Sequence, residues 1–287
     1  GEAEECAEML INNPEAHALF EAQIAYRRGE IDKVYEMARY FLESHSGFYA
    51  ILGGGMLLAQ CAIWRGDIYL WKEAKKHIFE APCKDAHDRE IVALTLAIID
   101  SSIYDNKDYP EWFKIGNFEL LPGDSHPAAK VFYIKYLYMA AYAIATGAVQ
   151  YEGVQGLALM RMIPNTIEPL ICWANANNTV MSEIYLRLTC AAVYHNAGRD
   201  DQAIRHIDRA IALALPDKLY GTLAEYCRVL DTLMEKRLCL VDEESWIKVK
   251  ELYKVYNEGW SKLSGAVRGK TIVTSLTTKQ REIAKLA

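Results

Sequence analysis

The strongest constraint on this chain is a recurring pattern of one amphipathic helix, a glycine and a second helix. The pattern occurs in "AQIAYRRGEIDKVYEMA", "AQCAIWRGDIYLWKEA", "AAYAIATGAVQYEGV" and "CAAVYHNAGRDDQAIRHIDRAIAL", around Gly29, Gly66, Gly147 and Gly198. A glycine at such a point supplies the left-handed residue that ends the first helix. Apolar residues recur at helical spacing almost throughout, whereas sustained alternation and Asn-Gly or Asp-Gly turns are missing. The chain is therefore predicted to be all-α.

Hairpins of this kind predict a stacked architecture, because two short antiparallel helices cannot bury their apolar faces alone and stacked copies share one core. The most regular copy resembles the tetratricopeptide repeat, in which small residues let paired helices approach closely; it carries Ala191, Tyr194, Gly198, Ala203 and Ala210. The other copies are less regular, with Val34 and Trp71 in the place of Ala203. We predict a tetratricopeptide-like α-solenoid of stacked helical hairpins over residues 1–263.

Two segments break the pattern. Residues 105–130 hold three prolines and several aromatic residues, which predicts an elaborated loop with a short helix beginning at Pro110. Residues 264–274, "SGAVRGKTIVT", are predicted to be a linker between the last solenoid helix and a new helix in residues 275–287.

Charge and cysteine usage narrow the class of protein. The net charge is −6, from 32 basic and 38 acidic residues, which argues against a nucleic-acid-binding surface over the whole molecule. Basic residues dominate only after position 264. Seven cysteines are scattered singly without a Cys-x-x-Cys motif, which favours reduced thiols in a cytoplasmic protein.

One run, Val131–Val149, is apolar enough to suggest a membrane span, but Lys135 lies inside it. We expect this run to be a helix buried among other helices, with no membrane contact.

Short motifs give little support for chemistry. "GAVRGKT", residues 265–271, is one residue too short for a phosphate-binding loop and follows a helix instead of a strand. "GGG", residues 53–55, lies in a helical pattern and predicts close helix packing or a helix start. Cys83 and His87 have ligand spacing, but no further ligands stand nearby, so no metal site is predicted there. Because no catalytic signature is present either, we expect no enzymatic activity and no cofactor.

Candidate effector-binding residues follow from the glycines. If each glycine marks the same turn, residues two, three and six positions earlier lie on the helix that lines the concave face. The polar and aromatic members of this set are Gln23, Tyr26, Arg27, Gln60, Trp64, His195 and Asn196. They would suit a small polar ligand or a peptide. The alternative is that they are ordinary half-buried residues whose hydrogen bonds are satisfied within the protein.

The end of the chain, "SLTTKQREIAKLA", has a helix start of its own. Thr277 and Gln280 form a capping box, and Ile283 and Leu286 give the helix one apolar face that needs a partner. The segment resembles the first helix of the LuxR-type helix-turn-helix domain, with Lys279 and Gln280 replacing the usual Arg and Glu. Under this resemblance the DNA-binding domain begins with Leu276, Thr277, Arg281, Glu282, Ile283 and Leu286.

Further segments resemble the helical-repeat region that precedes the DNA-binding domain in large LuxR-family regulators of the MalT-like kind. They are "YPEWFKIGNFELLP", "AKVFYIKYLYMAA" and "DQAIRHIDRAIALALPDKLYGTLAEY". The matching positions are Trp112, Gly116, Asn117 and Phe118 in the first segment, and Ala214, Pro216 and Asp217 in the last.

The resemblance implies a sensor and assembly region that controls an attached DNA reader. We expect a fragment that stops before the base-reading helix, so DNA would be contacted only through the rest of the longer protein. The effector would be a small molecule or a protein, and the apolar face of the last helix would suit docking on a second copy in a homodimer. The alternative is a scaffold that holds a protein or peptide partner and has no transcriptional role.

Overall fold

The computed structural model describes residues 14–44, 47–103, 110–114, 133–134, 137 and 156–268, and within these ranges the regular structure is helical, with no strand. The first group of helices comprises α2 (Pro14–Arg28), α3 (Ile31–Ser44), α4 (Phe48–Arg65), α5 (Ile68–Phe79), α6 (Ala86–Ser102) and the short α7 (Glu111–Lys114). The second comprises α9 (Gly156–Ala176), α10 (Val180–Asn196), α11 (Asp200–Ala214), α12 (Tyr220–Val241) and α13 (Glu243–Arg268). The prediction of an all-α chain is confirmed, and so is the short helix after Pro110.

Glycines end the first helix of three hairpins, as predicted. Gly29, Gly66 and Gly198 have φ angles of 85°, 62° and 72°, the left-handed conformation that other residues rarely adopt. After Gly66, the Asp67 side chain accepts hydrogen bonds from the backbone N–H groups of Tyr69 and Leu70 and thereby starts α5. Gly147 lies outside the described residues.

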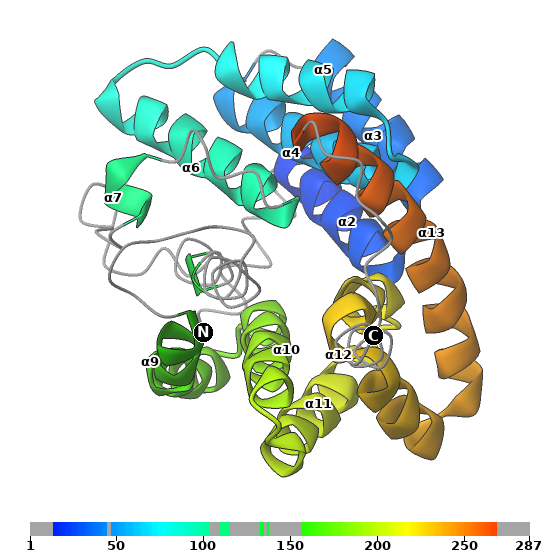
Figure 1. Cartoon of the computed structure of the whole chain (residues 1–287). Coiled ribbons are helices and arrows are strands. Elements are labelled where there is room, and N and C mark those ends of the chain that lie inside the picture. Colours follow the sequence, from blue (N-terminus) through cyan, green and yellow to red (C-terminus); the bar gives the residue numbers. More distant parts are fainter. Residues whose placement is uncertain are drawn as a thin grey trace.

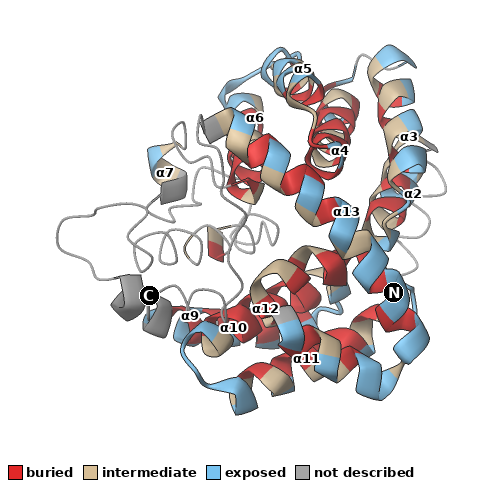
Figure 2. Cartoon of the chain, turned by 45° about the vertical axis from the view of Figure 1, so that its right-hand side comes forward, coloured by how far each residue is buried: buried red, intermediate tan, exposed pale blue. Residues whose placement is uncertain are grey.

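The core is built where small residues let helices approach closely. Ala191, Ala203 and Ala210 have no exposed surface, so α10 and α11 pack tightly together. The three glycines of residues 53–55 lie inside α4 and face α2, α3 and α5, which confirms the prediction of close helix packing. Figure 2 shows α4, α10 and α12 with their buried faces turned inward.

The last helix, α13, returns along the molecule and packs on α12, α4 and α5 (Figure 1). The Trp260 Nε1 donates to the Ser102 carbonyl at 2.7 Å, and the Ser264 hydroxyl donates to the Ile103 carbonyl at 3.0 Å. Helix α13 ends at Arg268, so it includes the first five residues of the predicted linker, Ser264 to Arg268. In an open solenoid each repeat contacts only its neighbours. Here α2 also contacts α12 and α4 contacts α13, so the stacked-hairpin solenoid stays a prediction.

Helix α4 is long and apolar enough to cross a membrane by length and composition alone. However, 72% of it is buried inside the protein, as expected for a central core helix. Most of the apolar run at 131–149 and all of residues 269–287, with the predicted start of the helix-turn-helix, lie outside the described residues.

Candidate functional site

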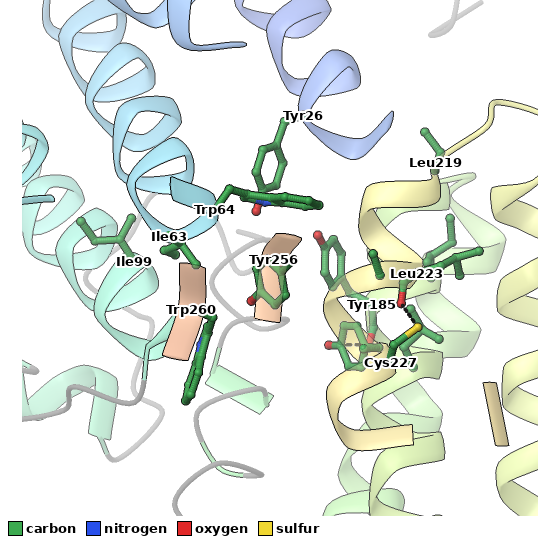
Figure 3. Close-up of a cluster of buried hydrophobic side chains, with 14 of the residues drawn as sticks. Tyr26, Ile63, Trp64, Ile99, Tyr185, Leu219, Leu223, Cys227, Tyr256 and Trp260 are labelled. Carbon is green, nitrogen blue, oxygen red and sulfur yellow. Dashed lines mark hydrogen bonds between the residues drawn. The ribbon is translucent and has the colours of Figure 1, made fainter. Parts of the chain in front are cut away.

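The residues predicted from the glycine register fall into two groups in the structure. The first group lies on α2 and α4, in the turns before Gly29 and Gly66. There these two helices meet α10, α12 and α13. In Figure 3, Tyr26 and Trp64 lie side by side, with Tyr256 and Tyr185 near them. His195 and Asn196 lie apart from this group, at the end of α10.

A polar cluster joins α2 to α10 and α12. The Tyr26 hydroxyl donates to Glu225 Oε1, and the Tyr185 hydroxyl donates to Glu225 Oε2 at 3.3 Å. Arg27 Nη1 donates to the Tyr185 hydroxyl, and its guanidinium carbon lies 4.8 Å from the centroid of the Tyr185 ring. The cluster sits at a close backbone approach, because Gly221 in the first turn of α12 lies against the backbone of Tyr26 and Arg27.

The surroundings fix the charge state of Tyr26, Arg27 and Tyr185. Burial, and next the Glu225 carboxylate, raise the pKa of Tyr26 well above its ordinary value. Burial also raises the pKa of Tyr185, although the Arg27 charge opposes this. For Arg27, burial alone would lower the pKa, but Tyr185, Glu225 and Tyr26 outweigh it, so the pKa is raised. At neutral pH both tyrosines are therefore hydroxyl donors and Arg27 is a cation.

Aromatic residues of α13 complete the other side of the site. The Trp64 and Tyr256 rings meet edge to face, with centroids 5.1 Å apart. The Arg228 guanidinium carbon of α12 lies 3.4 Å from the centroid of the Trp260 ring. The indole of Trp64 is 2% exposed, so it belongs to the interior and not to an open concave face.

Two predicted residues of α4 carry buried polar atoms with no hydrogen-bond partner among the described residues. They are the side-chain carbonyl oxygen of Gln60 (Oε1) and the indole nitrogen of Trp64 (Nε1). Residues four apart in a helix share one face. The face of α4 on which Trp64 contacts Tyr256 of α13 thus offers one hydrogen-bond acceptor, from Gln60, and one donor, from Trp64.

The second predicted group is occupied by local contacts. His195 Nδ1 lies 2.8 Å from Asp200 Oδ1, and the Asn196 amide donates to the Ala192 carbonyl at 2.8 Å. An open hollow of about 410 Å³ lies beside them, lined by residues 198–202 and Arg205. The structure does not join this hollow to the α2 and α4 residues, and a ligand-binding role for His195 and Asn196 stays a prediction.

The glycine spacing does not predict Tyr185, Glu225 or the aromatic residues of α13. It reaches only the last two turns before each glycine, and Tyr185 lies earlier in α10. Glu225 carried a signal that could have been used, because it is a lone acidic residue in the apolar run "LAEYCRVL". No family model, curated protein or solved structure matches this chain.

Proposed function

We propose that this chain is the effector-sensing and protein-interaction region of a LuxR-family transcriptional regulator, built from tetratricopeptide-like hairpins and without enzymatic activity of its own. The resemblance of residues 109–122, 129–141, 201–226 and 275–287 to that family supports the proposal. The left-handed glycines that end α2, α4 and α10 support the hairpin architecture.

The observation that carries the sensing role is the pair of unpartnered polar atoms on α4. Buried polar groups are nearly always hydrogen-bonded, and leaving one unpaired costs about 1–3 kcal/mol. Gln60 Oε1 and Trp64 Nε1 would both be satisfied by a small polar effector that offers one donor and one acceptor. The effector would then be recognised at residues that the sequence also selected.

The Gln60 and Trp64 site also contacts α13, the helix that precedes the proposed DNA-binding segment. Trp64 packs on Tyr256 of α13, and α13 runs on to Arg268, before the residues that resemble a helix-turn-helix. An effector that binds one arrangement of Trp64 more tightly than another shifts the equilibrium between them. The attached DNA reader would respond through the position of α13.

The Tyr26, Arg27, Tyr185 and Glu225 cluster has a different part in this proposal. Its hydrogen bonds are made within the protein, so it holds α2 against α10 and α12 as a fixed wall of the site. The movable part is then the α4–α13 contact.

The sensing role is tested by Gln60→Leu in the longer regulator, with a reporter gene for its response. Leucine removes the unpartnered oxygen at nearly the same volume. We expect the response to effector to be lost while the free energy of unfolding stays the same or rises by about 1–2 kcal/mol. Loss of function through unfolding is thereby separated from loss of recognition.

Gln202→Leu on α11 is the matched control and should keep the response. A normal response in Gln60→Leu would refute the sensing site. The regulator assignment has its own test in the coding sequence past Ala287. A turn followed by a second, basic helix supports it, whereas an unrelated domain would favour the scaffold that holds a protein partner.

A further inference from the structure

Three potential metal ligands meet on the side of the molecule formed by α9, α10 and α11. Glu168 comes from α9, Cys190 from α10 and His206 from α11, and their ligand atoms all lie within 4.8 Å of one another. These helices follow one another in the chain and lie together in Figure 1, away from the α4–α13 contact. The trio has no part in the proposed sensing site.

Two of the three distances within the trio match those between ligands of one tetrahedral ion, and the third is no longer than 4.8 Å. Zinc binds sulfur at about 2.3 Å, and imidazole nitrogen and carboxylate oxygen at about 2.0–2.1 Å. A tetrahedral arrangement then places sulfur about 3.6 Å from nitrogen, and nitrogen about 3.4 Å from oxygen. Here Cys190 Sγ lies 3.6 Å from His206 Nε2, and His206 Nε2 lies 3.4 Å from Glu168 Oε1.

The same geometry argues against a nucleophilic cysteine. In a catalytic triad the nucleophile and the acid contact opposite nitrogens of the histidine. Cys190 and Glu168 instead approach the same nitrogen, His206 Nε2. Cys190 also has no exposed surface. A buried thiol is unreactive toward substrates.

We propose that Glu168, Cys190 and His206 bind a Zn²⁺ ion, with the fourth position taken by water on the exposed side of Glu168. Thiolate, imidazole and carboxylate together are a ligand set typical of zinc. On binding, the Cys190 S–H bond is replaced by a bond from sulfur to zinc, and the proton passes to the buffer.

The histidine is held in a suitable orientation before any ion arrives. Its ring stacks on Tyr194, with centroids 5.6 Å apart and an interplanar angle of 23°. Its side chain is 11% exposed and that of Glu168 is 51% exposed, which leaves one open approach to the site.

The consequence of zinc binding is a cross-link between three helices. Helix α9 contains Pro164 and Pro169, each of which removes a backbone hydrogen bond from the helix interior. Glu168 stands directly before Pro169, so the ion would anchor α9 to the α10–α11 hairpin at a place where α9 lacks a backbone hydrogen-bond donor. Zinc should therefore stabilise the folded chain by mass action.

Co²⁺ and Zn²⁺ added to the chelator-treated full chain test the proposal. Co²⁺ should produce a thiolate charge-transfer band together with the visible bands of a four-coordinate site, and one equivalent of Zn²⁺ should abolish both. Zn²⁺ should also raise the melting temperature. Spectra without a thiolate band would overturn the proposal.

Glu168→Gln is the decisive variant, because this half-exposed side chain can be changed without disturbing the core. Its Zn²⁺ affinity, measured by calorimetry, should fall at least about tenfold. Cys190→Ala should abolish the charge-transfer band. Cys172→Ala and Glu258→Gln, at exposed positions outside the trio, are the matched controls and should bind as the unchanged chain does. An unchanged affinity in Glu168→Gln would overturn the site.

Discussion

Gly259 of α13 lies directly against the backbone carbonyl of Trp64, the residue before the last of α4. A Cβ atom on Gly259 would stand 2.1 Å from the Trp64 oxygen, far inside any real contact. The neighbouring atoms are also backbone, the carbonyl oxygen of Ile63 among them, so no side chain can rotate out of the way. This crossing fixes how closely α13 can return onto α4.

Gly259→Ala should therefore destabilise the fold by about 3 kcal/mol or more, because the two helices must separate to admit a methyl group. The higher helix propensity of alanine, about 1 kcal/mol, opposes the loss but is too small to cancel it. Urea unfolding followed by far-UV circular dichroism measures the difference.

Gly198→Ala is the matched comparison. Gly198 has a left-handed φ of 72° but no atom within 4 Å of an added Cβ, so its substitution carries only the backbone cost of about 1–2 kcal/mol. If Gly259→Ala costs no more than Gly198→Ala, the close crossing of α4 and α13 is not as tight as the structure shows.

The Glu225 carboxylate provides a second test, because hydroxyls from two other helices converge on it. Tyr26→Phe and Tyr185→Phe should each destabilise the chain by about 1–3 kcal/mol through the loss of one donor. The double variant should be destabilised by at least about 0.5 kcal/mol more than the sum of the two single variants. After one substitution the Glu225 carboxylate still accepts a hydrogen bond from the other tyrosine, whereas after both it accepts from neither. Unfolding free energies of the four proteins in this cycle measure the coupling.

The control for this cycle is Tyr69→Phe, at a side chain that is 81% exposed, where a change within about 0.5 kcal/mol is expected. Strict additivity of Tyr26→Phe and Tyr185→Phe would mean that the two hydroxyls do not share one acceptor.

Much of the local structure could be predicted from the sequence, because short-range rules decide it. The helix ends at Gly29, Gly66 and Gly198 follow from the left-handed conformation that glycine favours. The helix after Pro110 follows from the fixed φ of proline. Each of these features depends on a few consecutive residues.

The candidate site depended on contacts that no local pattern reveals. The glycine spacing predicts that Tyr26 and Arg27 face a ligand. Their hydrogen-bond partners Glu225 and Tyr185 instead lie far along the chain, on α12 and α10. The zinc trio was missed for the same reason, because its ligands come one each from three helices and have no motif spacing. The return of α13 onto α4 is also a long-range contact, and its closest backbone approach is at Gly259.

The ion pair between Arg39 of α3 and Glu73 of α5 predicts how stability depends on pH. Arg39 donates from two nitrogens to the two carboxylate oxygens of Glu73, the second at 3.0 Å. These hydrogen bonds, with burial opposing, lower the pKa of Glu73 below its ordinary value of 4.5. A carboxyl group whose pKa is lower in the folded state stabilises the protein above its unfolded pKa. That contribution is lost as the pH falls through the folded pKa.

Glu73→Gln should therefore reduce stability at pH 7, by less than about 1 kcal/mol because the pair is partly exposed. The difference from the unchanged chain should begin to shrink below pH 4.5 and vanish once the pH is below the folded pKa. Urea unfolding of both proteins between about pH 3 and pH 7 gives this difference directly, because all other carboxylates cancel. Glu80→Gln, at an exposed position just after α5, is the control and should change the free energy of unfolding at pH 7 by less than about 0.5 kcal/mol. A difference between Glu73→Gln and the unchanged chain that stays constant across this range would mean that Arg39 does not hold the Glu73 carboxylate in solution.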